Sequence, residues 1–303
     1  MTRRELLALA ASTAGSSAVS ANMSAAPAAP PVINGAEHAW VLNDPRFPLN
    51  QRLSNCPSSA PTREYSMEHL LSQMGTYGID KVVISHVCTY GTDNSYPAHI
   101  LKQHPSRFAA IGLLVGYRLH RPGDPENPGR LERLVKEQGF SGLRLSTIYD
   151  KDVVWMNDPL SYPLWKKAEE LGAVFNIFLA PNQISQVADM AQRFPGVKIV
   201  IDHFAMLDIT RPESEGIVPL LGLGRFPNVS IRTSLHNPSR EQIPYRDMWP
   251  YLRRVYDRFG PRRMIYANFY ELLIMKDLIP FFTAEDKKWI LGGNAMEIYR
   301  FGR

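Results

Sequence analysis

Short, almost continuously apolar runs recur along the chain from residue 32 onward, and polar residues, glycine or proline separate them. Runs of this length without a polar alternation are typical of parallel strands that are buried on both faces. Eight of them predict strands, over residues 32–38, 81–85, 108–114, 142–145, 173–178, 197–202, 229–232 and 263–267.

Between these runs, apolar residues recur at the spacing of one helix face, which predicts helices over 67–77, 131–138, 163–171, 183–194 and 247–259. Most of them stop at a glycine or a proline, the usual signal for a helix end. This alternation over about 270 residues predicts an α/β fold, a (β/α)8 TIM barrel in a single domain over residues 31–303. A doubly wound open sheet is the alternative. Such sheets usually carry a glycine-rich phosphate loop after the first strand, and Asn34-Gly35-Ala36-Glu37 is not one.

Composition and charge exclude some classes of partner. The 34 basic and 29 acidic residues give a net charge of +5, but they are interspersed, and no basic run is flanked by stacking aromatic residues. We therefore expect no nucleic acid as a partner, and a small molecule as the substrate. No stretch reaches about 18 uninterrupted apolar residues, so we expect no membrane span.

The first thirty residues differ from the rest of the chain. Twin arginines, Arg3 and Arg4, precede a short apolar stretch, and a Ser/Ala-rich segment follows as far as Pro30 and Pro31. Residues 1–30 therefore read as an export signal of the twin-arginine type, which would place the protein in the periplasm. The alternative is a disordered tail on a cytoplasmic protein.

The chain has two cysteines, Cys56 and Cys88, and neither belongs to a CxxC or nucleophile motif. In an oxidising compartment they could pair, because both would lie on loops that follow early strands. The sequence slightly favours the other interpretation, two unpaired thiols.

Two predicted strands lead to a histidine: His38 is the last residue of the first strand, and His203 directly follows the sixth. The carboxyl ends of barrel strands are where such enzymes place their chemistry. Imidazole titrates near neutrality, so His38 and His203 are candidates for a general base and a general acid. Asp202 precedes His203 and is a candidate to orient an imidazole or to hold the local backbone. Side chains alternate along a strand, so Glu37 is expected to point away from His38.

Other polar residues at predicted strand ends are candidates for binding a substrate. Arg144 and Arg232 are permanent cations, suited to a carboxylate or to a developing oxyanion. The remaining candidates are Tyr90, Asp93, Asn94, His236 and Asn268. These candidates also have structural interpretations. His38 or His203 could be a core residue, Arg144 could pair with a carboxylate, and Asp93 could cap the helix after it.

Several segments resemble the amidohydrolase-related, or amidohydrolase 2, family of TIM barrels. The resemblance covers residues 31–301 and rests on segments 33–40, 90–94, 142–145, 201–203 and 282–299. In the last segment a Gly-Asn-Ala turn begins a closing helix that packs on the barrel. The family includes lactonases such as pyrone-dicarboxylate lactonase and decarboxylases of aromatic acids, and its members often form homodimers.

In the metal-dependent members, the resemblance implies ligands at four strand ends: an H-x-H or E-x-H pair after strand one, histidines after strands five and six, and an aspartate after strand eight. These side chains hold Zn²⁺ or a similar cation, which activates a water molecule. This sequence has Ala36 in the first position, Phe178 near the end of strand five and Asn268 at the end of strand eight. We therefore expect no metal cofactor. A divalent cation such as Zn²⁺ on His38 and His203 is the alternative.

The resemblance implies a hydrolase that opens a small carboxylated or oxygenated cyclic ester with a degenerate metal site. In that reaction His38 or His203 would activate water, while Arg144 and Arg232 would bind the acid and the developing charge. The alternatives are an aromatic-acid decarboxylase, which is a lyase, or a barrel that binds a ligand without catalysis.

Overall fold

The computed structural model describes residues 30–49, 61–116, 119–150 and 152–302. Nearly all of the predicted export segment lies outside these ranges, so export stays a prediction. Cys56 also lies outside them. Cys88 is not a free thiol, so the interpretation of two unpaired thiols is wrong for this residue. No helix within the described ranges is long and apolar enough to cross a membrane.

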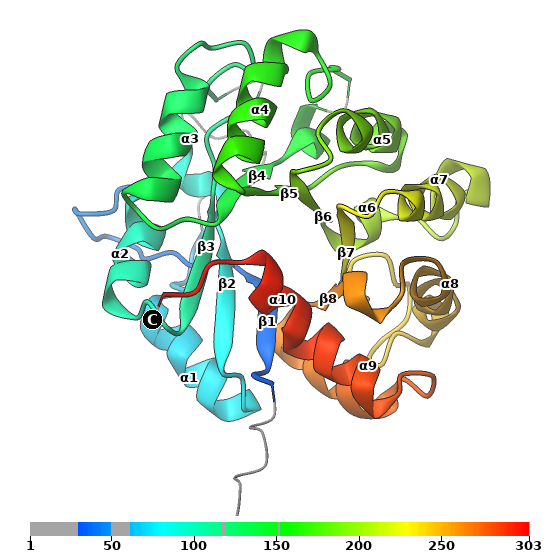
Figure 1. The fold of residues 1–303 in the computed structure, drawn as a ribbon. Coiled ribbons are helices and arrows are strands. Elements are labelled where there is room, and N and C mark those ends of the chain that lie inside the picture. Colours follow the sequence, from blue (N-terminus) through cyan, green and yellow to red (C-terminus); the bar gives the residue numbers. More distant parts are fainter. Residues whose placement is uncertain (1–29, 50–60, 117–118, 151, 303) are drawn as a thin grey trace, which may run out of the picture.

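Eight parallel strands follow one another around the molecule in chain order, each paired with the next, as Figure 1 shows. All eight predicted strands are confirmed and so is the TIM barrel, while the open-sheet alternative is wrong. The strands are β1 (Ile33–Glu37), β2 (Lys81–Ser85), β3 (Phe108–Gly112), β4 (Gly142–Leu145), β5 (Val174–Ile177), β6 (Lys198–Ile201), β7 (Val229–Thr233) and β8 (Met264–Tyr266).

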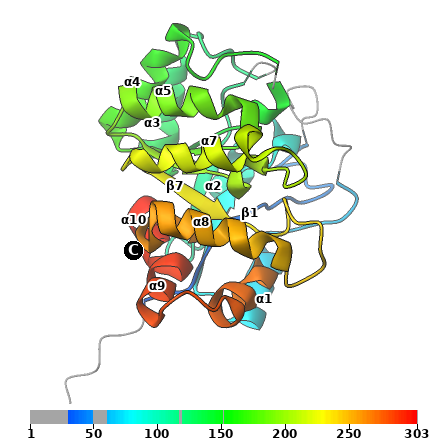
Figure 2. The ribbon, with the colours of Figure 1, turned by 90° about the vertical axis from the view of Figure 1, so that its right-hand side faces the viewer.

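Helices surround the strands, and Figure 2 shows α7 and α8 side by side on the outside. The five predicted helices are present, but the second begins at Asn127, because Pro128 fits a first helical turn. The helices are α1 (Met67–Tyr77), α2 (Ser95–Gln103), α3 (Asn127–Lys136), α4 (Tyr162–Leu171), α5 (Ile184–Arg193), α6 (His203–Met206), α7 (Ile217–Gly222), α8 (Trp249–Phe259), α9 (Ala284–Lys288) and α10 (Asn294–Ile298).

The C-terminal segment packs across the amino ends of the strands. Arg300 donates its backbone N–H to Ser141, just before β4, and Lys198 at the start of β6 donates to the carbonyl of Glu297. Ala295 and Tyr299 belong to an apolar cluster inside the barrel together with residues of β1, β2, β3, β5, β6 and β8. The expected closing helix is therefore confirmed, and the opposite end of the barrel is left as the mouth.

The barrel has a seam between β1 and β8. No backbone ladder joins these two described strands, although they lie in contact. The side chain of Asn34 spans the seam instead, where its Oδ1 accepts a hydrogen bond from the backbone N–H of Asn268 at 2.9 Å. Gly35 allows the close approach, because a Cβ there would meet the side chain of Ile265 and lie 2.7 Å from the carbonyl oxygen of Tyr266.

This geometry predicts opposite effects for the same substitution at two glycines. Gly35→Ala is expected to lower the free energy of unfolding by about 1–3 kcal/mol, because the new methyl overpacks the seam. Gly75→Ala, inside α1 with no atom within 4 Å of the added Cβ, is expected to raise it by up to about 1 kcal/mol. Urea unfolding of both variants checks the prediction, and equal effects would contradict it.

Candidate functional site

A small cavity of about 50 Å³ lies at the centre of the mouth, at the carboxyl ends of the strands, and has room for a few water molecules. Most of its lining comes from residues at or just beyond strand ends: Ala36, Glu37, His38, Ser85, Arg144, Asp202, His203, Arg232 and Asn268. The structure thus brings together six residues that the sequence singled out, from positions spread over more than two hundred residues of the chain.

The floor of this cavity is a buried ion-pair network. Asp202 lies between two arginines: its Oδ2 is 3.2 Å from Arg144 Nε, and its Oδ1 pairs with Arg232 Nη1. Burial by itself raises the pKa of Asp202, but the charges of Arg232 and Arg144 outweigh burial, so the pKa is lowered and the carboxylate stays ionised. One anion between two cations leaves the floor with a net charge of about +1, in a place where a low dielectric strengthens electrostatic attraction.

The two arginines differ in the hydrogen bonds that their terminal nitrogens make. Arg232 is fully buried; its terminal nitrogens donate to Asp202 and to the hydroxyl of Tyr299, 3.0 Å away, while its buried Nε has no hydrogen-bond partner among the described residues. Arg144 packs its guanidinium against the ring of Phe178, 4.4 Å from the ring centre, and within the described residues its terminal nitrogens donate no hydrogen bond. Arg144 is therefore the cation that remains able to bind an anionic group in the mouth.

His38 is held as a neutral imidazole. Its Nδ1 lies 2.6 Å from the carbonyl oxygen of Ser85, so Nδ1 must carry the hydrogen and Nε2 keeps its lone pair. Burial, followed by the nearby charge of Arg144, lowers the pKa of His38 to about 4. The residue is thus a hydrogen-bond acceptor toward the cavity rather than a cation at neutral pH.

His203 begins a left-handed turn. Four successive non-glycine residues, His203 to Met206, have φ between 48° and 55°, a conformation that costs about 1–2 kcal/mol for each residue. His203 Nδ1 is 2.8 Å from the hydroxyl of Ser234. Burial lowers the pKa of His203 to about 3, although Asp202 acts against this shift. The turn holds a neutral imidazole at the cavity against its own backbone preference.

Glu37 lines the cavity together with His38, so the expectation that it points away is wrong. The reason is an irregularity in β1: the four residues from Asn34 to Glu37 lie opposite only three residues of β2, from Val82 to Ile84. Such a bulge re-aims the side chains that follow it. Burial raises the pKa of Glu37 to about 7, while the amide of Asn34, 2.8 Å from its Oε1, acts in the opposite direction.

His236 is paired with a carboxylate that the sequence analysis missed. Glu271 is fully buried and accepts hydrogen bonds from the backbone N–H groups of Leu235 and His236, at 2.9 and 3.0 Å. Its Oε1 also lies 2.6 Å from His236 Nδ1, and the side-chain amide of Asn268 is 3.2 Å from the same nitrogen. A glutamate within the mostly apolar run 269–275 was the only signal that could have revealed it.

Four predicted binding residues are not among those that line the cavity: His236, whose ring lies beside that of His203, and Tyr90, Asp93 and Asn94, which lie after β2. The hydroxyl of Tyr90 accepts from the backbone N–H of Val41 at 3.0 Å, and Asn94 uses its side chain on both backbone groups of Leu113. Asp93 accepts from the N–H of Ser95 at 2.9 Å, as the helix-capping alternative anticipated. The side chains of Tyr90, Asp93 and Asn94 organise the loop after β2, and the geometry gives no support to a contact with substrate.

The donor set at the strand ends does not fit the metal centre that the resemblance implies. A catalytic zinc site normally needs three protein ligands. Ala36, Phe178 and Asn268 occupy positions where that centre would need histidine or carboxylate. Within the described ranges, no group of three or more histidine, cysteine, aspartate or glutamate side chains is placed to hold a metal ion.

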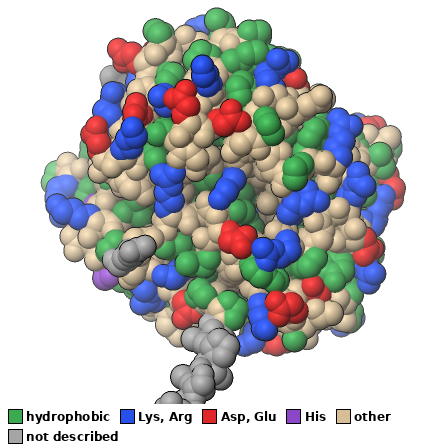
Figure 3. All heavy atoms as spheres, viewed as in Figure 1, with side chains coloured by type: hydrophobic (Ala, Val, Ile, Leu, Met, Phe, Trp, Pro, Cys, Tyr) green, Lys and Arg blue, Asp and Glu red, His purple; other side chains and the backbone are tan. Residues whose placement is uncertain are grey.

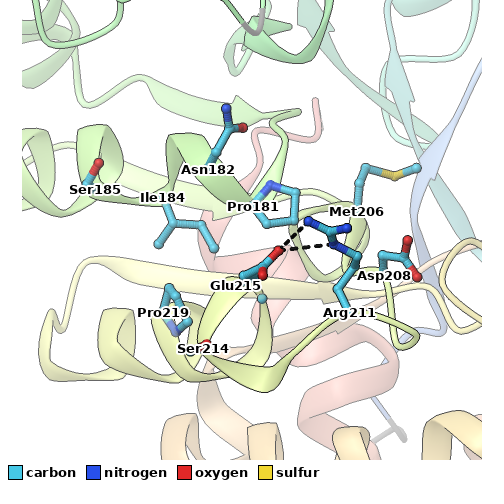
Figure 4. A pocket seen from close by; sticks show the side chains of 11 residues that line it. Pro181, Asn182, Ile184, Ser185, Met206, Asp208, Arg211, Ser214, Glu215 and Pro219 are labelled. Atoms are coloured by element: carbon cyan, nitrogen blue, oxygen red, sulfur yellow. Dashed lines mark hydrogen bonds and ion pairs between the residues drawn. The ribbon is translucent and has the colours of Figure 1, made fainter.

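Larger hollows lie outside the central cavity, between segments that follow the strands. The groove in Figure 4, of about 660 Å³, lies between α5 and α7, and two of its three charged residues, Arg211 and Glu215, pair with each other at 2.7 Å. Another groove, of about 720 Å³, lies between residues 119–124 and 153–160. On the face in Figure 3, basic and acidic side chains are interspersed without a patch of one sign. Neither groove gathers buried titratable groups as the central cavity does.

Known proteins share this architecture. L-fucono-1,5-lactonase of Burkholderia ambifaria is 24% identical over 262 residues, which cover 80% of this chain and 87% of that protein. The crystal structure of a probable 2-pyrone-4,6-dicarboxylic acid hydrolase from Acinetobacter baumannii, with citric acid bound, superposes with a TM-score of 0.71 at 17% identity and covers 88% of this chain and 98% of that one.

A 5-carboxyvanillate decarboxylase from Novosphingobium aromaticivorans, with bound manganese, reaches a TM-score of 0.61 at 15% identity and covers 87% of this chain and 95% of that one. At these identities the structural likeness shows the fold alone. The family profile described as "Amidohydrolase" matches residues 57–301, most of the barrel. The chain therefore belongs to the amidohydrolase family of TIM barrels.

Proposed function

We propose that this protein is a hydrolase that opens a small cyclic ester bearing a carboxylate, and that it does so without a metal ion. The observation that carries the proposal is Arg144, whose terminal nitrogens lie in a mouth with a positively charged floor. The named activity of the lactonase relative agrees with a cyclic ester, and that of the probable dicarboxylic acid hydrolase agrees with a substrate that bears carboxylates.

The chemistry follows from charge and protonation. Hydrolysis of an ester puts negative charge on the carbonyl oxygen as water attacks, and donors fixed in advance at that place lower the barrier. Arg144 supplies such a donor, or binds the substrate carboxylate, or does both through the N–H groups of its two terminal nitrogens. A histidine at the mouth supplies the acceptor for the proton of a water molecule that the cavity has room to hold.

The side chains available as metal ligands at the strand ends support metal independence. Glu37 lines the cavity with His38 and His203, but within the described ranges no three such side chains are placed to hold a metal ion, and the net positive floor repels a cation. We expect carboxylate binding at the place where the metal-dependent relatives of this family bind a cation.

A substrate panel with metal analysis tests the proposal. The purified full chain is assayed with a carboxylated lactone, a neutral lactone of the same ring size and an aromatic acid, before and after dialysis against a chelator. We expect hydrolysis of the carboxylated lactone, with kcat unchanged by dialysis and less than stoichiometric transition metal.

The other outcomes are distinct from one another. Release of CO₂ from the aromatic acid would replace the hydrolase by a lyase. Stoichiometric metal whose removal abolishes turnover would overturn metal independence while leaving the hydrolase intact. Binding of the lactone without turnover would identify a barrel that retains only ligand binding.

A further inference from the structure

His38, His203 and His236 differ in whether their surroundings stabilise or destabilise the protonated imidazole. Burial lowers the pKa of His38 and His203, and the charges of Arg144 and Arg232 act in the same direction while Asp202 acts against them, so their surroundings as a whole oppose the imidazolium that forms when a base accepts a proton. His236 instead has a carboxylate at 2.6 Å from its Nδ1. A general base gains positive charge in the transition state, so a neighbouring anion stabilises it and neighbouring cations destabilise it.

The tautomer and orientation of His236 are also fixed by its partner. Glu271 is held by two backbone N–H groups and accepts from Nδ1, so in the neutral imidazole Nδ1 carries the hydrogen and Nε2 has the lone pair. The ring of His236 lies 6.3 Å from that of His203 and 5.5 Å from that of Tyr270. Its side chain is 29% exposed, so water reaches it.

Given the proposed function, we propose that His236 is the general base of the hydrolysis and that Glu271 is its positioning residue. The water oxygen bonds to the lactone carbonyl carbon as one of its protons passes to Nε2 of His236. The ring carbon–oxygen bond then breaks, and the same proton passes from Nε2 to the leaving ring oxygen. No proton passes to Glu271 in either step. The products are a carboxylic acid and a hydroxyl group on one chain, and no further reactant is needed.

Substitutions at the two residues test the pair through kinetics. We expect His236→Asn to lower kcat for the carboxylated lactone by at least about 10²-fold with little change in KM, because binding by Arg144 is intact. Glu271→Gln is expected to lower kcat as well. The double variant should be no worse than His236→Asn alone, because the two residues act as a unit.

A matched control and a chemical rescue separate catalysis from structure. His104→Asn changes a histidine at the end of α2, beside the amino end of β3 and away from the mouth, and should leave kcat unchanged. Free imidazole should restore part of the turnover to His236→Ala, which a purely structural loss would not allow. If His236→Asn keeps kcat within about threefold of the wild type while His203→Asn does not, the pair is not the base.

The protonation state of His236 gives a readout that does not depend on turnover. In ¹⁵N NMR of the wild type, we expect a hydrogen on Nδ1 and none on Nε2, and a changed Nδ1–H signal in Glu271→Gln. An Nε2–H tautomer would overturn the inference whatever the substrate panel shows. If the wild type opens no lactone at all, the proposed function fails on that result alone, before any variant is compared.

Discussion

Asp202→Asn is expected to lower the free energy of unfolding by about 3–5 kcal/mol, the largest effect on stability that we predict. Asparagine has nearly the same shape, but without the carboxylate the charges of Arg144 and Arg232 face each other in a buried place. A buried charge without a counter-ion costs far more than the lost hydrogen bonds. Urea unfolding followed by circular dichroism measures the change.

Asp257→Asn is the matched control for this prediction. Asp257 also pairs with an arginine, Arg253, but both side chains are 52% exposed, so its loss should cost less than about 1 kcal/mol. Similar losses for Asp202→Asn and Asp257→Asn would mean that the network at the mouth contributes no more to stability than an ion pair on the surface.

Arg144→Met is expected to lower kcat/KM for a carboxylated lactone by roughly 10²–10³-fold, because losing a charged partner in a desolvated site costs about 2–5 kcal/mol and each 1.4 kcal/mol is tenfold. Methionine keeps an unbranched side chain against Phe178 while it removes the charge. For the neutral lactone of the same ring size we expect a smaller loss. Steady-state kinetics on both substrates measures the difference.

Two further variants sharpen this result. Arg144→Lys should restore only part of the activity, since an ammonium lacks the planar fork of a guanidinium. Arg253→Met, on the surface of α8, should change neither substrate's kinetics. Equal losses for the charged and the neutral lactone would show that Arg144 does not select the carboxylate.

Much of the architecture could be predicted because the physics that determines it is local. Uninterrupted apolar runs identify buried strands, and glycine or proline at helix ends identifies the connections. The strand order then places His38, Arg144, His203 and Asn268 at one end of the barrel, because the carboxyl ends of parallel strands face the same way.

The rest of the site depends on features that have no local signal. The bulge in β1 that aims Glu37 inward arises from pairing with β2, which the residues of β1 do not encode by themselves. The left-handed turn from His203 to Met206 also has no signal in the sequence, because a run of non-glycine residues does not favour that conformation. Glu271 could not be matched to His236 because their contact depends on the path of the chain after β8.

Tyr299 ties the closed end of the barrel to the open one. Its hydroxyl receives a hydrogen bond from Arg232 at 3.0 Å and donates one to Asn176 at 3.2 Å, and Arg232 in turn holds Asp202 and, through it, Arg144. Three successive side-chain contacts thus connect Tyr299, in the C-terminal segment, with the guanidinium of Arg144 at the mouth. Directed evolution of substrate preference should therefore randomise α10 and the residues after it as well as the rim loops, because a library restricted to the rim leaves out part of what shapes the floor.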